Sequence, residues 1–343
     1  MPQDFQNALV VGGAGFIGAH LCEYLLDHNR HVICIDDYVT GHEENIDHLL
    51  ARPGFTMVRH DITTPFDLKT MAGTKRAKAI YEGIHEIYHC ALTDSPQWYV
   101  HHPIETLNTG IAGTKNVLDV ATQYRAKVLF LSDLRVYGML PQEGYTPSED
   151  YVGVLNHLDP LNYYAYAKRT AEAMVVAYAK NYSLSYAIAR VGTVYGPGMY
   201  LDDGRIVPHL IASALANKPL QIPRALEKGA FCFISDVVNG LEKVMASENS
   251  GIYNINHTAV YTYKELAEKI IALTKSTSKI EWLADEAVND PVQKAWELHN
   301  DIGNIYKVKE ETGWFPVVLL DEGLKKTIDF MKTLRGVKHI ARR

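Results

Sequence analysis

The sequence predicts an α/β fold with a doubly wound parallel sheet, and three observations carry this prediction. Short apolar runs that suit buried strands alternate with amphipathic helical segments through residues 8–191, as in parallel sheets that helices cover on both faces. The first apolar run breaks into glycines spaced G-x-x-G-x-x-G and continues as a helix. The second run ends in an acidic residue about twenty positions later. We therefore expect a ligand in the crevice at the carboxyl ends of the strands.

The expected elements follow in chain order. The strands cover residues 8–11, 32–35, 56–59, 86–90, 127–132 and 185–191, and the helices between them cover residues 18–27, 104–124 and 161–180. Past residue 191 the pattern changes, with a Gly-, Pro- and Asp-rich stretch at 192–205, a helix at 206–216, a strand entering a helix at 231–238, a last sheet strand at 251–256, and helices near 263–274 and 321–334. A second, smaller unit therefore follows the sheet and is interleaved with it.

The glycines of the first turn predict a dinucleotide site. A strand that turns through glycines into a helix presents backbone N–H groups and a helix N-terminus to a diphosphate. Gly12 would permit the turn, Gly15 the approach of the phosphates, and Gly18 the packing of helix on strand. Asp36 suits the adenosine ribose hydroxyls, and together with Asp37 it would repel a 2′-phosphate. These residues favour NAD over NADP.

With a cofactor assigned, the chain divides into an NAD-binding domain and a lid. We expect residues 1–191 and 231–256 to form the NAD-binding domain. Residues 192–230 and 257–335 would form an α/β lid domain that binds the substrate, and residues 336–343 a basic tail.

Composition narrows the classes of partner and compartment. A formal net charge of −6 over 343 residues argues against general binding to nucleic acid or to a membrane surface. The four cysteines form no C-x-x-C pair, which favours reduced thiols in a cytoplasmic protein. No apolar run approaches membrane-spanning length, and the histidines lack metal-ligand spacing, so we expect neither a membrane nor a metal partner.

Tyr164 and Lys168 are the candidate catalytic pair. They are four residues apart in an expected helix and so project from one face. A nearby ammonium lowers the pKa of a phenol, which makes tyrosine a usable general base. Such a base can take the proton of a hydroxyl while hydride passes to a nicotinamide.

At this point the chain resembles a known family. The glycine loop, Asp36, Asp61-Ile62, Asn108 and the Y-x-x-x-K pair are together similar to the extended short-chain dehydrogenases/reductases, the NAD-dependent epimerase/dehydratase family. The resemblance covers nearly the whole chain. Residues 58–62, 95–96, 147–151, 203–207 and 230–241 are most similar to UDP-glucuronate decarboxylases, which are lyases.

The resemblance implies a Rossmann-like fold, tightly bound NAD, and oxidation of a nucleotide-linked sugar at C4 to a transient ketone. It also implies a homodimer in which the helices at 104–124 and 161–180 form a four-helix bundle. Tyr164 would be the base and Lys168 would orient the nicotinamide ribose. The expected cofactor-binding residues are Gly12, Gly15, Phe16, Ile17, Gly18, Asp36, Asp37, Asp61, Ile62, Ala91, Asn108, Tyr164 and Lys168. The expected substrate-binding residues are Arg135, Thr193, Arg205 and Arg224.

Two departures from the family pattern fall at the expected catalytic centre. Asp133 stands where the family has Ser or Thr, and Arg135 where decarboxylases and dehydratases have Glu. An ionised carboxylate about 4 Å from a forming tyrosinate costs about 4 kcal/mol at an effective dielectric near 20, or roughly three pKa units. Asp133 is therefore protonated, or turned away, or replaced by Ser132 through a bulge in the strand, or the chemistry differs.

Arginines of the decarboxylases are also missing. This chain has Gly198, Gly229 and the pair Leu298-His299 at those positions, and glycine cannot clamp a diphosphate or carboxylate as a guanidinium does. The prediction is a UDP-glucuronate decarboxylase-like enzyme. The alternatives are a sugar-nucleotide 4-epimerase or 4-oxidoreductase and, in a different class, an NAD-binding homologue without catalytic activity.

Overall fold

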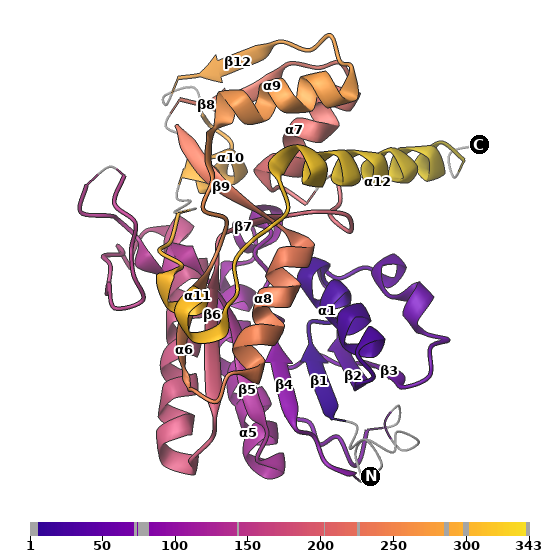
Figure 1. Ribbon diagram of the computed structural model, residues 1–343, viewed down its shortest axis with the longest axis vertical. Coiled ribbons are helices and arrows are strands. Elements are labelled where there is room, and N and C mark those ends of the chain that lie inside the picture. Colours follow the sequence, from indigo (N-terminus) through magenta and orange to yellow (C-terminus); the bar gives the residue numbers. More distant parts are fainter. Residues whose placement is uncertain are drawn as a thin grey trace.

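A seven-stranded parallel sheet forms the lower half of the molecule in the view of Figure 1. The computed structural model describes residues 6–71, 74, 82–142, 144–201, 203–224, 227–284, 288–297 and 302–340. The sheet strands are β1 (Asn7–Val11), β2 (His31–Asp36), β3 (Phe55–Arg59), β4 (Glu86–His89), β5 (Lys127–Asp133), β6 (Tyr186–Val191) and β10 (Gly251–Ile255). Their order is β10-β6-β5-β4-β1-β2-β3, and every neighbouring pair is parallel. The predicted fold class is confirmed.

Helices cover both faces of this sheet because its strands are apolar on both sides. In β1, Ala8 and Val10 pack into one core with α1 (Phe16–Asp27) and α8 (Ile234–Ala246). Leu9 and Val11 pack into a second core with α5 (Thr114–Tyr124) and α6 (Tyr163–Tyr182). Successive side chains of a strand point to opposite faces, so one continuous apolar run supplies both layers. The strand order reverses between β1 and β4, where a ligand crevice is expected.

The single helix expected at 104–124 is three segments. It consists of α4 (Pro103–Asn108), a π-helical turn (Thr109–Gly113) and α5, and it follows the short helix α3 (Pro96–Tyr99). Gly110, in the π turn, lies against α6, where an added Cβ would be 2.8 Å from the Cβ of Ala167. The sequence pattern could not show this interruption, which is set by the contact between helices. Such π turns are frequent at functional sites.

The chain after β6 builds two small sheets beside the large one. The first has the order β11-β9-β7, from β7 (Thr193–Tyr195), β9 (Lys228–Phe233) and β11 (Val260–Thr262), and the second pairs β8 (Leu220–Pro223) with β12 (Ile280–Leu283). The remaining helices are α7 (Ile206–Leu215), α9 (Tyr263–Thr274), α10 (Pro291–Glu297), α11 (Tyr306–Thr312) and α12 (Leu320–Ile340). The sequence predicts residues 231–233 as part of the sheet domain, but they lie in β9, which pairs with β7 and β11.

Two expected absences can be compared with the described residues. Within them, no helix is both long enough and apolar enough to cross a membrane, and no group of His, Cys, Asp and Glu side chains could hold a metal ion. The expected basic tail begins inside α12, whose backbone is helical to Ile340, and residues 341–343 lie outside the described part.

Candidate active site

A cavity of about 620 Å³ lies at the carboxyl ends of the sheet strands. It begins at the turn after β1 and runs past the ends of β2, β4, β5 and β6 to Arg205. All thirteen expected cofactor-binding residues line it, namely Gly12, Gly15, Phe16, Ile17, Gly18, Asp36, Asp37, Asp61, Ile62, Ala91, Asn108, Tyr164 and Lys168. Because they line one cavity, we propose that these residues bind the cofactor together.

The glycine turn fits a dinucleotide diphosphate. Gly12 has φ +81°, and an added Cβ would lie 2.7 Å from the backbone of Ala91. A Cβ on Gly18 would overlap the carbonyl oxygen of Gly12. Helix α1 begins at Phe16 with Gly15 as its N-cap, and no side chain caps it, so its first N–H groups are available to an anion. This cradle is the structural feature that NAD requires.

Asp36 ties the glycine turn to the end of β2. Its Oδ2 accepts the N–H of Ala14 at 2.9 Å and its Oδ1 accepts the N–H of Tyr38 at 2.8 Å. Burial raises the pKa of Asp36, and the backbone donors partly offset that increase. Each carboxylate oxygen can accept more than one hydrogen bond, so these contacts leave acceptor capacity for a ribose.

Tyr164 and Lys168 lie in the first turns of α6 and line the same cavity as Asp36 and Asp37 near the end of β2. The Lys168 Nζ donates to the carbonyl oxygen of Leu131 in β5 at 2.6 Å and lies 5.5 Å from the centre of the Tyr164 ring. Burial lowers the pKa of Lys168 to about 8. Tyr164 and Lys168 are therefore buried neighbours that line the same cavity.

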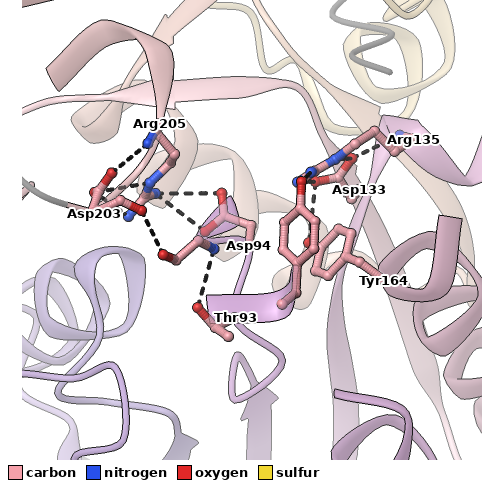
Figure 2. A network of polar contacts seen from close by, with 9 residues as sticks. Thr93, Asp94, Asp133, Arg135, Tyr164, Asp203 and Arg205 are labelled. Carbon is pink, nitrogen blue, oxygen red and sulfur yellow. Dashed lines mark hydrogen bonds and ion pairs between the residues drawn. The ribbon is translucent and has the colours of Figure 1, made fainter. Parts of the chain in front are cut away.

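Asp133 faces Tyr164 rather than turning away (Figure 2). The Tyr164 hydroxyl donates to Asp133 Oδ2 at 3.2 Å. Arg135 holds the same carboxylate through Nε at 3.0 Å, Nη2 at 2.8 Å and its backbone N–H at 2.7 Å. A carboxylate in a bidentate pair with a guanidinium has a fixed orientation.

The charges of this cluster are settled by Arg135. Burial alone would raise the pKa of Asp133, but the charge and hydrogen bonds of Arg135 outweigh it and hold that pKa below its usual range. Burial, and then the Asp133 charge, raise the pKa of Tyr164 well above the ordinary phenol value. At neutral pH the pair is a protonated tyrosine that donates to an ionised aspartate.

Ser132 does not replace the missing hydroxyl. Its Oγ donates to Glu172 Oε1 at 2.5 Å, and Glu172 is ion-paired with Arg190 at 2.7 Å. Strand β5 keeps a regular register with β6 through both residue 132 and residue 133, so the bulge that this expectation required is absent from β5. The catalytic prediction for Ser132 is corrected: its hydroxyl belongs to a buried ion-pair cluster.

Arg135 also orders two aromatic rings. Its Nη1 donates to the Tyr99 hydroxyl at 2.9 Å, and its guanidinium carbon lies 4.3 Å from the centre of the Tyr164 ring. The Tyr99 and Tyr164 rings are stacked with centres 5.0 Å apart. Tyr99 was missed by the sequence analysis, because a tyrosine in α3 carries no signal that it meets α6. Arg135 and Thr193 line a small adjoining cavity of about 20 Å³.

Arg205 lies between two carboxylates that were not predicted as site residues. Its Nε and Nη2 contact Asp203 Oδ2 at 3.0 and 2.8 Å, and its Nη1 contacts Asp94 Oδ1 at 3.2 Å (Figure 2). Asp94 and Arg205 line both cavities. Arg224 lines neither cavity. Its backbone N–H donates to Leu283 at the end of β12, so the structure does not bring this predicted substrate residue into the site.

The glycines that stand where the resemblance implies arginines bring no side-chain cation to the site. Gly198 lines the main cavity with φ +90°, a backbone conformation that side chains rarely adopt, and Gly229 lies in β9. Leu298 and His299 lie outside the described residues.

Comparison with known proteins identifies the family behind this geometry. The NAD dependent epimerase/dehydratase family matches residues 8–256. The chain belongs to this family. The predicted resemblance and the expected NAD dependence of an enzyme of this class are thereby confirmed.

Several relatives match along almost the whole chain. The chain is 34% identical to UDP-glucuronic acid decarboxylase 1 of Danio rerio, over 99% of this chain and 75% of that protein. It is 34% identical to UDP-glucuronic acid decarboxylase 6 of Arabidopsis thaliana, over 94% and 88%. Among solved structures, UDP-glucuronic acid 4-epimerase of Bacillus cereus with UDP-glucuronic acid and NAD superposes with a TM-score of 0.80 at 25% identity, covering 96% of this chain and 100% of that one.

Proposed function

We propose that this protein oxidises a ring hydroxyl of a nucleotide-linked sugar to a ketone and reduces the ketone again after a rearrangement. The observation that carries the proposal is the contact between Tyr164 and Asp133, beside Lys168, in a cavity that the glycine turn also lines. The named relatives support it, since they are decarboxylases and epimerases of UDP-glucuronic acid.

The protein's contribution to the oxidation is a two-step proton path. The substrate hydroxyl would bond to the Tyr164 oxygen, which receives its proton while the tyrosine's own proton passes to Asp133 Oδ2. One proton leaves the substrate and one arrives on the carboxylate, so the tyrosine is unchanged. NAD, held by the residues that line the cavity, would accept the hydride in the oxidation, and the NADH so formed would return it in the later reduction. During that reduction the same path returns the proton.

This path explains why an aspartate is compatible with a catalytic tyrosine. A tyrosinate beside ionised Asp133 would carry two like charges whose oxygens are 3.2 Å apart, which is strongly unfavourable in a buried site. A protonated tyrosine that relays its proton to the carboxylate avoids that state. Arg135 and Tyr99 hold the carboxylate and the phenol ring in place for the relay.

The test compares Tyr164→Phe with Tyr166→Phe. Tyr166 lies two residues along the same helix and donates to the Leu155 carbonyl, outside the cavity-lining set, so its variant is a matched control for loss of one phenol hydroxyl. Both proteins would be incubated with NAD and a panel of UDP-, GDP-, CDP- and dTDP-sugars, with product mass as the readout. Tyr164→Phe should reduce turnover by about 10² or more, whereas Tyr166→Phe should not. Equal turnover by both variants would refute the proposal.

Product mass also separates the reactions that can follow oxidation. Loss of carbon dioxide from UDP-glucuronate would mean decarboxylation, the reaction named for the relatives. An isomer of unchanged mass would mean 4-epimerisation, and loss of water would mean dehydration. If NAD binds and no member of the panel is converted, the result favours a substrate outside the panel or a non-catalytic NAD-binding homologue.

We also propose a homodimer in the cytoplasm. The cysteines Cys22, Cys34 and Cys232 are buried and free, and Cys90 is half-buried and free, as expected for a reducing compartment. For the dimer, the support is apolar surface on the helices at 104–124 and 161–180, where Ile111 is 48% and Val176 41% exposed.

A further inference from the structure

The cations at the sugar end of the cavity are already neutralised. Arg205 is 15% exposed and contacts both Asp203 and Asp94. Its contact with Asp203 uses two guanidinium nitrogens, so a ligand carboxylate would have to displace a bidentate partner. Displacement leaves a buried carboxylate unpaired, which is costly.

The second guanidinium is occupied in the same way. Arg135 contacts Asp133 through two side-chain nitrogens and Tyr99 through the third. It therefore has no guanidinium nitrogen without a partner. The Lys168 ammonium donates to the Leu131 carbonyl beside Tyr164. It is therefore already engaged next to the tyrosine.

The acidic side chains at this end are placed to repel a negative group. Asp94 is the most exposed of them, at 34%, and lines both the main cavity and the small cavity beside Asp133. In Figure 2 it lies between the Arg205 cluster and the Tyr164 cluster. A substrate carboxylate there would face Asp94, and no arginine among the described residues that line the two cavities has an unpaired guanidinium to receive it. A carboxylate in the site repels a ligand carboxylate and so favours neutral ligands.

Asp94 and its neighbours are well suited to a neutral sugar. Carboxylates are strong acceptors for hydroxyl donors, and a hexose with a hydroxymethyl group presents such donors without charge. Gly198, in the wall of the same cavity, and Gly229, in β9, bring no side chain that could compensate a carboxylate.

We propose that the substrate is a nucleotide-linked neutral hexose, and that a sugar carrying a carboxylate is discriminated against by Asp94 and by the absence of a free cation, since Arg135 and Arg205 are already paired. This inference rests on the proposed function, because it specifies the substrate class of the same site. It has a chemical consequence: decarboxylation requires a carboxylate on the sugar, so the ketone leads instead to epimerisation or dehydration.

The test is a binding measurement on NAD-loaded protein with substrate pairs that differ only at C6. UDP-glucose is compared with UDP-glucuronate, and GDP-mannose with GDP-mannuronate, by titration calorimetry, so that no turnover is needed. We expect the neutral member of each binding pair to have a Kd lower by about tenfold or more. Equal or tighter binding of the uronate would overturn this inference and leave the proposed function standing. If neither pair binds, this inference fails, and the product-mass panel with its four nucleotides decides separately whether the proposed function fails too.

A variant identifies the cause of the discrimination. Asp94→Asn removes the exposed carboxylate and frees part of Arg205, so the preference for the neutral sugar should fall by about threefold or more. Asp329→Asn removes the same charge from an exposed position on α12 and should keep the wild-type ratio. An Asp94→Asn ratio equal to wild type would overturn the electrostatic explanation. In wild type, the ratio should also shrink as salt rises, which tests the same cause without a substitution.

Discussion

At the scale of single residues, the pair Asp133–Arg135 keeps Tyr164 protonated, so the tyrosine must relay a proton rather than act as a tyrosinate. Taken separately, each residue contradicts the family pattern, and an aspartate near a tyrosinate is electrostatically unfavourable. Taken together, they form a neutral pair in which Arg135 also touches both stacked tyrosine rings. The two departures are therefore one compensated change.

Removing Arg135 should expose the cost of burying Asp133. In Arg135→Ala the carboxylate keeps its burial and loses its principal partner, so we expect the free energy of unfolding to fall by about 3–5 kcal/mol at pH 7. The measurement is urea unfolding of the variant and wild type. The double variant Asp133→Asn, Arg135→Leu removes both charges and should recover part of the loss. A loss as large in the double variant would contradict this account.

The same variant carries a pH signature. In wild type the pKa of Asp133 lies below its usual range, so its stabilisation is complete at neutral pH and is lost only as pH falls through that low value. Without Arg135, burial raises the pKa of Asp133 above the unfolded value, so the folded variant gains a proton and relative stability as pH falls. The stability difference between the two proteins should be largest near pH 7 and shrink towards pH 4.

At the scale of elements, the turn between β1 and α1 is specified by its glycines, each with a different neighbour. Gly18 packs on the Gly12 carbonyl, whereas the nearest atom to a Cβ on Gly15 would be that same oxygen at 3.3 Å. Gly15 also has an ordinary extended conformation, with φ −73°. The two positions therefore separate folding from ligand approach.

This difference predicts two distinct variants. Gly15→Ala should keep the melting temperature within a few degrees and weaken NAD binding by about tenfold or more, because its methyl group lies where the backbone approaches the diphosphate. Gly18→Ala should lower both the melting temperature and the affinity, because the helix must move off the strand. Thermal unfolding and calorimetric NAD titration measure these effects. Equal loss of stability in both variants would show that Gly15 is needed for folding.

At the scale of the whole molecule, apolar residues of α5 and α6 divide between core and surface. Val117, Val120 and Val175 contribute to the apolar character that predicts a dimer, yet they are buried within one chain. Exposed apolar side chains on these helices include Ile104 in α4, Ile111 in the π turn and Val176 in α6. Exposed apolar side chains on these helices are candidates for an interface between two copies.

Val176→Glu should therefore disrupt association. We expect sedimentation velocity to give twice the 38.5 kDa chain mass for wild type and one chain mass for the variant, because a carboxylate cannot be buried unpaired at an apolar interface. Val260→Glu, at a similarly exposed position in β11, is the matched control and should remain dimeric. A wild-type mass of one chain would contradict the homodimer.

The residues expected to bind NAD were predicted partly from the family resemblance, and all of them line one cavity. The sequence by itself determined the parallel sheet, the glycine turn and the pair Tyr164–Lys168. These features are encoded locally, by periodicity, by glycines and by a four-residue helical spacing, so they can be predicted without the fold. The tertiary structure decided whether Asp133 meets Tyr164, whether Ser132 replaces it, and which partners neutralise Arg205. Asp94, Tyr99 and Asp203 join the site from separate segments. Their contacts depend on strand register and loop packing, and no pattern along the chain records a distance between segments.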